Sequence, residues 1–130
     1  MKEEESVTPK RVLIVEDEVM VAMMIGDMLI DLRCEVAATA ARLDEAVRLA
    51  HTAAFDLAIL DVNLAGQPTY TVAEALRARR IPFVFATGYG ASHIDKAYDD
   101  APILPKPFQQ QDLARAIERI FGSASSVRQG

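Results

Sequence analysis

Short, largely apolar runs that stop abruptly at acidic or hydroxyl side chains limit the possible folds of this chain more than any other feature. The runs cover residues 11–15, 55–60 and 83–86, and the side chains that follow them are Glu16, Asp61 and Thr87. Such runs are typical of strands buried on both faces of a parallel sheet. We therefore predict a buried parallel sheet with polar side chains at the ends of its strands.

Segments with apolar side chains at helical spacing fill the intervals between these runs. The predicted helices span residues 19–32, 43–52, 71–80 and 109–121, and weaker strands are predicted at 35–38 and 103–104. Pro82 supports the end of the third helix, because the residue before a proline avoids the helical region. The alternation predicts an α/β fold with five parallel strands covered on both faces, with the functional groups at the carboxyl ends of the strands.

The stretch from residue 87 to residue 102 differs from the rest of the chain, because it contains Gly88 and Gly90 and few large apolar residues. We predict at best a short helix at 92–98 and expect this stretch to be the least stable segment. Residues 1–9 and 122–130 are expected to be flexible, which leaves one domain over residues 10–121.

Composition excludes several classes of protein. A chain of 130 residues with 51% hydrophobic residues fits one domain, and its net charge of -5 argues against a basic nucleic-acid-binding face. The single cysteine, Cys34, and a charged N-terminus without an apolar signal stretch favour a reducing cytoplasm. The longest apolar stretch, Val19 to Ile30, is interrupted at Asp27 and is too short to cross a bilayer. We therefore expect a cytoplasmic protein without a membrane span.

Five side chains are expected to meet at one edge of the sheet: Glu16, Asp17, Asp61, Thr87 and Lys106. Carboxylates brought together raise one another's pKa unless a cation neutralises them, and hard oxygen ligands select Mg²⁺, which can bridge to a phosphate. Asp61 is then the natural nucleophile, and Lys106 and Thr87 can contact the phosphoryl oxygens. Each residue alone has an ordinary explanation as a capping, turn or surface residue. Their occurrence at successive strand ends favours phosphoryl chemistry.

Four segments resemble the signatures of response-regulator receiver domains, in the same order and at the usual spacings. They are Val12–Glu18, Ile59–Leu64, Phe85–Gly88 and Leu104–Phe108. The resemblance covers about residues 10–121 and implies a CheY-like, flavodoxin-like doubly wound (βα)5 fold with the strand order 2-1-3-4-5.

The resemblance also implies roles for individual residues. Asp61 would be phosphorylated by a sensor histidine kinase or a histidine phosphotransfer protein, and Thr87 and Lys106 would contact the phosphoryl group. The implied ligands of Mg²⁺ are Glu16, Asp17, Asp61 and the backbone carbonyl of Asn63. We therefore expect a single-domain response regulator of a two-component phosphorelay that signals by binding a partner.

Two departures from the family pattern bear on how a signal would leave the site. Receivers usually carry an aromatic residue three positions before the lysine, and here that position is Ile103. Phe85–Gly90 instead resembles the FAT GUY subgroup, named for a Phe-Ala-Thr-Gly-X-Tyr motif, with the tyrosine one place early at Tyr89. In that subgroup the fourth helix tends to be short or mobile. We therefore predict that phosphorylation reorganises residues 87–98.

Partner binding is expected because only nine residues follow Phe121, too few for a DNA-binding output domain. The helix at 19–32 carries an inward stripe that includes Met24, and also apolar residues Met20, Met23 and Ile30 on a neighbouring face. These three either pack under the last helix or form a docking face for a kinase or phosphotransfer protein. Both alternatives stay open at this stage.

Rival functions fit less well. A phosphatase with an aspartate nucleophile needs a second acid two residues later, where this chain has Asn63, so we expect at most slow self-dephosphorylation and no enzyme. A nucleotide-binding protein of similar fold needs a phosphate loop after the first strand, where Glu16–Glu18 would repel phosphate. A receiver-like binding module that acts without phosphorylation remains the main alternative.

Overall fold

A five-stranded parallel sheet forms the centre of the computed structural model, which describes residues 8–88 and 94–122. Its strands are β1 (Arg11–Val15), β2 (Glu35–Ala40), β3 (Leu57–Asp61), β6 (Phe83–Thr87) and β7 (Ile103–Pro105). Their spatial order is β2-β1-β3-β6-β7. In chain order of these parallel strands, this is the predicted order 2-1-3-4-5, so the doubly wound α/β fold is confirmed.

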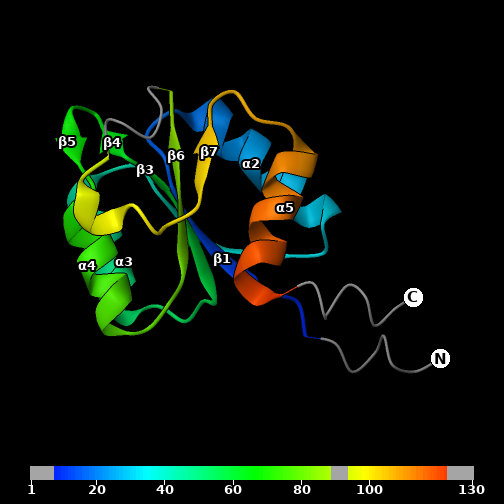
Figure 1. Cartoon of the computed structure of the whole chain (residues 1–130), viewed down its shortest axis with the longest axis horizontal. Helices are drawn as coiled ribbons and strands as arrows, with labels where there is room; N and C mark the ends of the chain where they lie inside the picture. The colour runs from blue at the N-terminus through cyan, green and yellow to red at the C-terminus, as the bar shows by residue number, and fades with distance from the viewer. Residues whose placement is uncertain (1–7, 89–93, 123–130) are drawn as a thin grey trace.

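Helices cover both faces of the sheet (Figure 1). The helices α2 (Val19–Asp31) and α5 (Gln110–Phe121) lie on one face, and α3 (Leu43–Thr52) and α4 (Tyr70–Ala78) lie on the other. Between β6 and β7 the described residues contain only the 3₁₀ helix η2 (Lys96–Tyr98). The described chain therefore has four α-helices rather than the five of the predicted (βα)5 pattern. Part of the short helix predicted at 92–98 lies outside the described residues.

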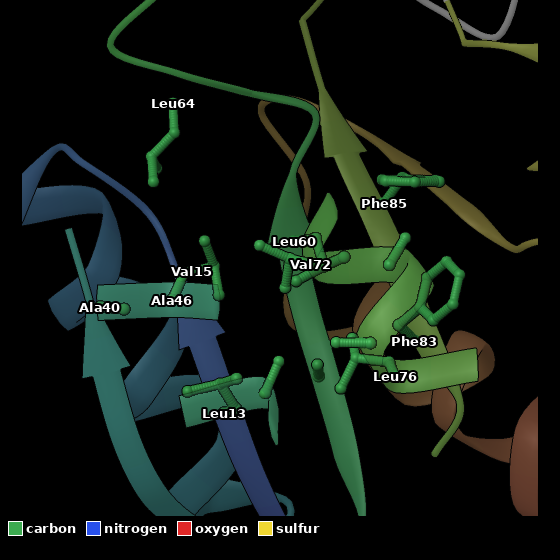
Figure 2. Close-up of a cluster of buried hydrophobic side chains, with 14 of the residues drawn as sticks. Leu13, Val15, Ala40, Ala46, Leu60, Leu64, Val72, Leu76, Phe83 and Phe85 are labelled. Atoms are coloured by element: carbon green, nitrogen blue, oxygen red, sulfur yellow. The ribbon is translucent and has the colours of Figure 1, made fainter. Parts of the chain in front are cut away.

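The strands divide their side chains between two cores, because successive residues of a strand point to opposite faces. Leu60 and Phe85 belong to the core under α3 and α4, part of which is seen in Figure 2, whereas Ile59 and Val84 belong to the core under α2 and α5. All four are at most 1% exposed. The strand that ends at Asp61 is thus packed from both sides.

The loop predicted around Gly66 and Pro68 contains a small hairpin of β4 (Asn63–Leu64) and β5 (Gln67–Pro68). Its two turn residues, Ala65 and Gly66, both have positive φ angles, of 50° and 88°. Two consecutive left-handed residues are what a tight two-residue hairpin requires. The hairpin leaves the sheet directly after Asp61 and returns at the start of α4.

The exposed face of α2 contradicts one of the two alternatives predicted for its apolar side chains. Met20, Met23 and Ile30 are 80%, 64% and 61% exposed, so the alternative in which they pack under the last helix is wrong. Met24, predicted to point inward, is also exposed, and the buried positions of α2 are Ala22, Ile25 and Leu29. The inward stripe is therefore narrower than the apolar spacing indicated.

The two ends of the described chain meet at one corner of the domain. The ammonium of Lys10 lies 4.4 Å from the centre of the Phe121 ring. The predicted flexible segments 1–9 and 122–130 lie almost entirely outside the described residues. Among the residues that are described, no helix is long and apolar enough to cross a membrane.

Candidate functional site

The structure brings the predicted acidic residues together at the carboxyl ends of the strands. Glu16 and Asp17 follow β1, and Asp61 is the last residue of β3. One carboxylate oxygen from each of the three lies within 4.8 Å of the others. Such a group of hard oxygen atoms is suited to a divalent cation.

Lys106 is the cation in direct contact with this group. Its Nζ donates to Glu16 Oε1 at 2.8 Å and to Asp61 Oδ2 at 3.2 Å. Burial alone would lower the pKa of Lys106, but the hydrogen bond to Glu16 and the charges of Asp61 and Glu16 outweigh burial and raise it. Lys106 therefore remains an ammonium, and its charge offsets part of the repulsion between the carboxylates.

Asp61 lies in a partly desolvated position. Burial raises the pKa of the Asp61 carboxyl above its ordinary value, the charge of Glu16 adds to this effect, and Lys106 opposes it. The backbone N–H of Asn63 donates to Asp61 Oδ1 at 3.3 Å. Each oxygen of the carboxylate is thus contacted by a donor, which fixes how the group faces the site.

The hairpin after Asp61 is closed by polar contacts at both ends. The Asn63 side chain accepts a hydrogen bond from Gly66 N at 2.8 Å, which holds the turn. At the far end, the hydroxyl of Thr69 donates to the backbone oxygens of Asp61 at 2.7 Å and Val62 at 3.1 Å. These contacts fix the hairpin against the end of β3.

A surface cavity of about 680 Å³ opens over the acidic residues. Its walls include Asp17, Asp61, Asn63, Thr87 and Lys106. Glu16 is 2% exposed and is not among the residues that line the cavity. The backbone N–H of Lys106 donates to the carbonyl of Thr87 at 2.8 Å, so the ends of β6 and β7 are joined beside the cavity. Five of the six residues predicted to form the site thus line one open space, and the sixth, Glu16, contacts Lys106.

Sequence reasoning missed two parts of this region. Thr69 contacts the backbone of Asp61, but a single threonine eight residues after the aspartate gave no motif signal.

Tyr98 is the second feature that sequence reasoning missed. It is buried, stacks on Tyr70 with ring centres 5.1 Å apart, and donates a hydrogen bond to Glu74. Its ring also contacts Phe85, two residues before Thr87, at 5.9 Å. Position 103 is isoleucine, and a tyrosine from the segment between β6 and β7 contacts β6 instead.

Comparison with known proteins assigns the family. Residues 12–118 match the family model of the response regulator receiver domain. The chain belongs to this family. Receiver domains of this type are signalling regulators rather than enzymes, which agrees with the class predicted from the sequence.

Known receiver proteins and structures resemble the chain along most of its length. It is 34% identical over 118 residues to the transcriptional regulatory protein PdtaR of Mycobacterium tuberculosis, a match that covers 88% of this chain and 58% of that protein. The solution structure of SdrG from Sphingomonas melonis Fr1 is 41% identical, covers 87% of this chain and 97% of SdrG, and has a TM-score of 0.78. The response regulator PhyR from Brucella abortus is 28% identical, with 93% of this chain and 52% of PhyR covered and a TM-score of 0.74. This receiver thus spans nearly all of SdrG but little more than half of PdtaR and PhyR.

Proposed function

We propose that this receiver, over residues 10–121, accepts a phosphoryl group on Asp61 from a histidine kinase or histidine phosphotransfer protein in a Mg²⁺-dependent reaction. The observation that carries the proposal is the group of three carboxylates within 4.8 Å of one another, with Lys106 in contact with two of them. The phosphorylated form then signals by binding another protein.

The reaction is a transfer between two side chains. A carboxylate oxygen of Asp61 attacks the phosphorus of a phosphohistidine and a new P–O bond forms. The P–N bond breaks, and its electron pair stays on the imidazole of the donor. Lys106 and Thr87, which line the same cavity, supply an ammonium and a hydroxyl for the phosphoryl oxygens.

The residues present fit a magnesium ion. Glu16, Asp17, Asp61 and the backbone carbonyl of Asn63 would hold it, and the open cavity leaves room for the waters that Mg²⁺ retains. When bound, Mg²⁺ neutralises charge on the phosphoryl group during transfer. Asp17 and Asp61 border the cavity, and the buried Glu16 would complete the carboxylate group.

The test is phosphorylation by a small donor. We expect the protein to gain the mass of one phosphoryl group when it is incubated with acetyl phosphate and Mg²⁺, and not when Mg²⁺ is chelated. Asp61→Asn should abolish the gain, whereas Asp56→Asn, just before the other end of β3, should not. No gain by the wild type would favour a binding module that acts without phosphorylation, and a gain that survives Asp61→Asn would exclude Asp61 as the acceptor.

The exposed apolar face of α2 is the proposed docking surface for the phosphodonor. Val19, Met20, Met23 and Ile30 are all more than 60% exposed, and α2 begins three residues after Glu16. A helical phosphodonor that packs on this face would bring its histidine close to Asp61. Methionine adapts its shape to such a partner because its side chain is unbranched and flexible.

Substitutions in α2 distinguish docking from chemistry. Met23→Glu should slow transfer from a phosphorylated kinase or phosphotransfer protein by about tenfold or more, since it places a charge in an apolar interface. Its phosphorylation by acetyl phosphate should stay unchanged. His51→Glu, an exposed position on α3, is the matched control. Equal transfer rates for Met23→Glu and His51→Glu would count against docking on α2.

For the downstream step, we propose that phosphorylation reorganises residues 87–98, of which 89–93 lie outside the described residues. The described part of this segment is tied to α4: Asp95 N donates to the Tyr70 hydroxyl at 2.8 Å, and Tyr98 bonds to Glu74. One family relative, a double mutant of PhyR from Bartonella quintana that is 27% identical to this chain, is an anti-anti-sigma factor. By analogy with PhyR, we propose that the phosphorylated form of this receiver binds a protein partner. Amide hydrogen exchange with and without beryllofluoride tests the step, and unchanged protection at residues 94–98 would rule it out.

A further inference from the structure

Thr69 is a buried polar residue that neither the family motifs nor the proposed reaction uses. Among the described residues, the buried polar or charged side chains are Glu16, Thr69 and Thr87. Glu16 and Thr87 belong to the acidic site, whereas Thr69 is fully buried just behind it. Burying a hydroxyl is unfavourable unless it is hydrogen-bonded, so the partners of Thr69 are informative.

Those partners belong to the peptide that carries Asp61. The Thr69 hydroxyl donates to Asp61 O at 2.7 Å, with a longer contact of 3.1 Å to Val62 O. The backbone N–H of Thr69 donates to Val62 O at 3.0 Å. The carbonyl of Thr69 accepts from Val72 N and Ala73 N at the start of α4. Thr69 thus closes the segment that leaves at Asp61 and anchors it to a helix.

The peptide plane between Asp61 and Val62 is therefore held at both of its polar ends. Its N–H, from Val62, donates to Ala86 O in β6 at 3.2 Å. Its C=O, from Asp61, accepts from Thr69. A peptide unit is planar, so fixing both ends fixes the rotation of the chain at Asp61 and the direction in which its side chain leaves. The acceptor from β6 is the carbonyl of Ala86, next to Thr87. The donor is the hydroxyl of Thr69, which directly precedes α4.

We propose that Thr69 is a positioning residue for the phosphoacceptor, and this inference rests on the proposed function. Its hydroxyl holds the Asp61 carbonyl so that the carboxylate faces Lys106 and the cavity. Without that donor, the Asp61–Val62 peptide can rotate. The carboxylate, and the Asn63 carbonyl two residues later, then sample orientations that do not suit metal binding or attack.

The test compares variants that separate the hydroxyl from the shape of the side chain. Thr69→Val keeps the shape and removes the donor, Thr69→Ser keeps the donor, and Thr69→Cys is a second variant with a poor donor should Thr69→Val fail to fold. Val72→Ala is the structural control, because Val72 is buried in α4 and has an apolar side chain. Phosphorylation by acetyl phosphate with Mg²⁺ is followed by mass, well below the unfolding temperature of every variant.

We expect Thr69→Val to slow phosphorylation about tenfold, which is the size of effect that one lost hydrogen bond produces, and Thr69→Ser to restore a rate near that of the wild type. A second readout uses no phosphoryl donor: Mg²⁺ titration followed by the NMR signals of the Asp61 and Asn63 amides should show weaker binding in Thr69→Val alone. Wild-type behaviour of Thr69→Val in both readouts, or an equal loss in Val72→Ala, would overturn the inference. If the wild type binds Mg²⁺ but accepts no phosphoryl group, the proposed function fails, and the Mg²⁺ titration still decides the role of Thr69.

Discussion

Replacing Lys106 with methionine should destabilise the metal-free protein at neutral pH, because it leaves two partly or fully buried carboxylates without their cation. Glu16 and Asp61 side chains are 2% and 13% exposed, and Lys106 is 23% exposed. Removing one partner of a buried ion pair costs about 3 to 5 kcal/mol, and removing one partner of an exposed pair costs about 0 to 1 kcal/mol. The Lys106 contacts lie between these limits and nearer the buried one. We expect a loss of about 2 to 3 kcal/mol of unfolding free energy.

Urea unfolding is a suitable assay, since with a slope of roughly 1.5 kcal/mol per molar the midpoint should fall by about 1.3 to 2 M. Arg115→Met is the control, because the Arg115–Asp112 pair lies on the surface and should contribute about 0.5 kcal/mol or less. Saturating Mg²⁺ should recover part of the Lys106→Met loss, since the metal replaces the missing positive charge.

The pH dependence gives a second check. Burial raises the pKa of Asp61 and Lys106 lowers it, so Lys106→Met should raise that pKa further. When folding raises the pKa of a carboxyl, the protonated carboxyl stabilises the folded protein. This contribution is fully present below the pKa of the unfolded chain and is lost as the pH rises through the pKa of the folded protein. The difference between the wild type and Lys106→Met should therefore narrow as the pH is lowered from about 7 to about 4.5. Equal stability at pH 7, or a difference that does not narrow in acid, would refute this account of Lys106.

Further predictions concern the segment after β6 and the hairpin. Burial, the hydrogen bond to Glu74 and the charge of Glu74 raise the pKa of Tyr98 to about 12, so ultraviolet titration should show a tyrosine that ionises about two units late and is absent from Tyr98→Phe. The unfolded chain releases this proton at a lower pH than the folded protein. The free energy of unfolding should therefore fall as the pH rises from 10 to about 12, and should fall less steeply in Tyr98→Phe. Gly66→Ala should cost about 1 kcal/mol in urea unfolding, because φ at Gly66 is 88° while no neighbour lies near the added methyl group; an unchanged midpoint would show that strain is absent.

Three of the strands have strong local signals in the sequence, and the acidic site could be predicted from the side chains that follow the strands. The strand Arg11–Val15 contains the apolar run Val12–Val15, which favours a buried strand, and it ends at the predicted residue. Asp61, Thr87 and Lys106 could be placed together because parallel strands deliver their carboxyl ends to one edge of the sheet. The direction of the strands was enough to place these three residues together, and the conformations of their side chains were not needed.

Features that depend on tertiary packing could not be predicted. The hairpin β4–β5 is too short to show any periodicity, and its turn at Ala65 includes a residue that rarely adopts a positive φ. Met24 has the right spacing for the buried stripe of α2, but burial depends on how far the neighbouring elements reach around the helix. The role of Thr69 depends on a contact between residues 61 and 69 across that unpredicted hairpin.

The contact between Lys10 and Phe121 has a practical consequence for experiments on this protein. Lys10 directly precedes β1 and Phe121 is the last residue of α5, whereas Asp61 is at the carboxyl end of β3. In Figure 1 the start of β1 and the end of α5 lie together at the end of the sheet opposite the carboxyl ends of the strands. A purification tag or fluorophore joined beyond either residue therefore starts on the side opposite the acidic cavity. Because the two ends adjoin, a short linker could also join them and new ends could be opened at the exposed turn at Arg33, between α2 and β2. Such a circularly permuted chain would leave the strand that ends at Asp61 and its neighbours uncut.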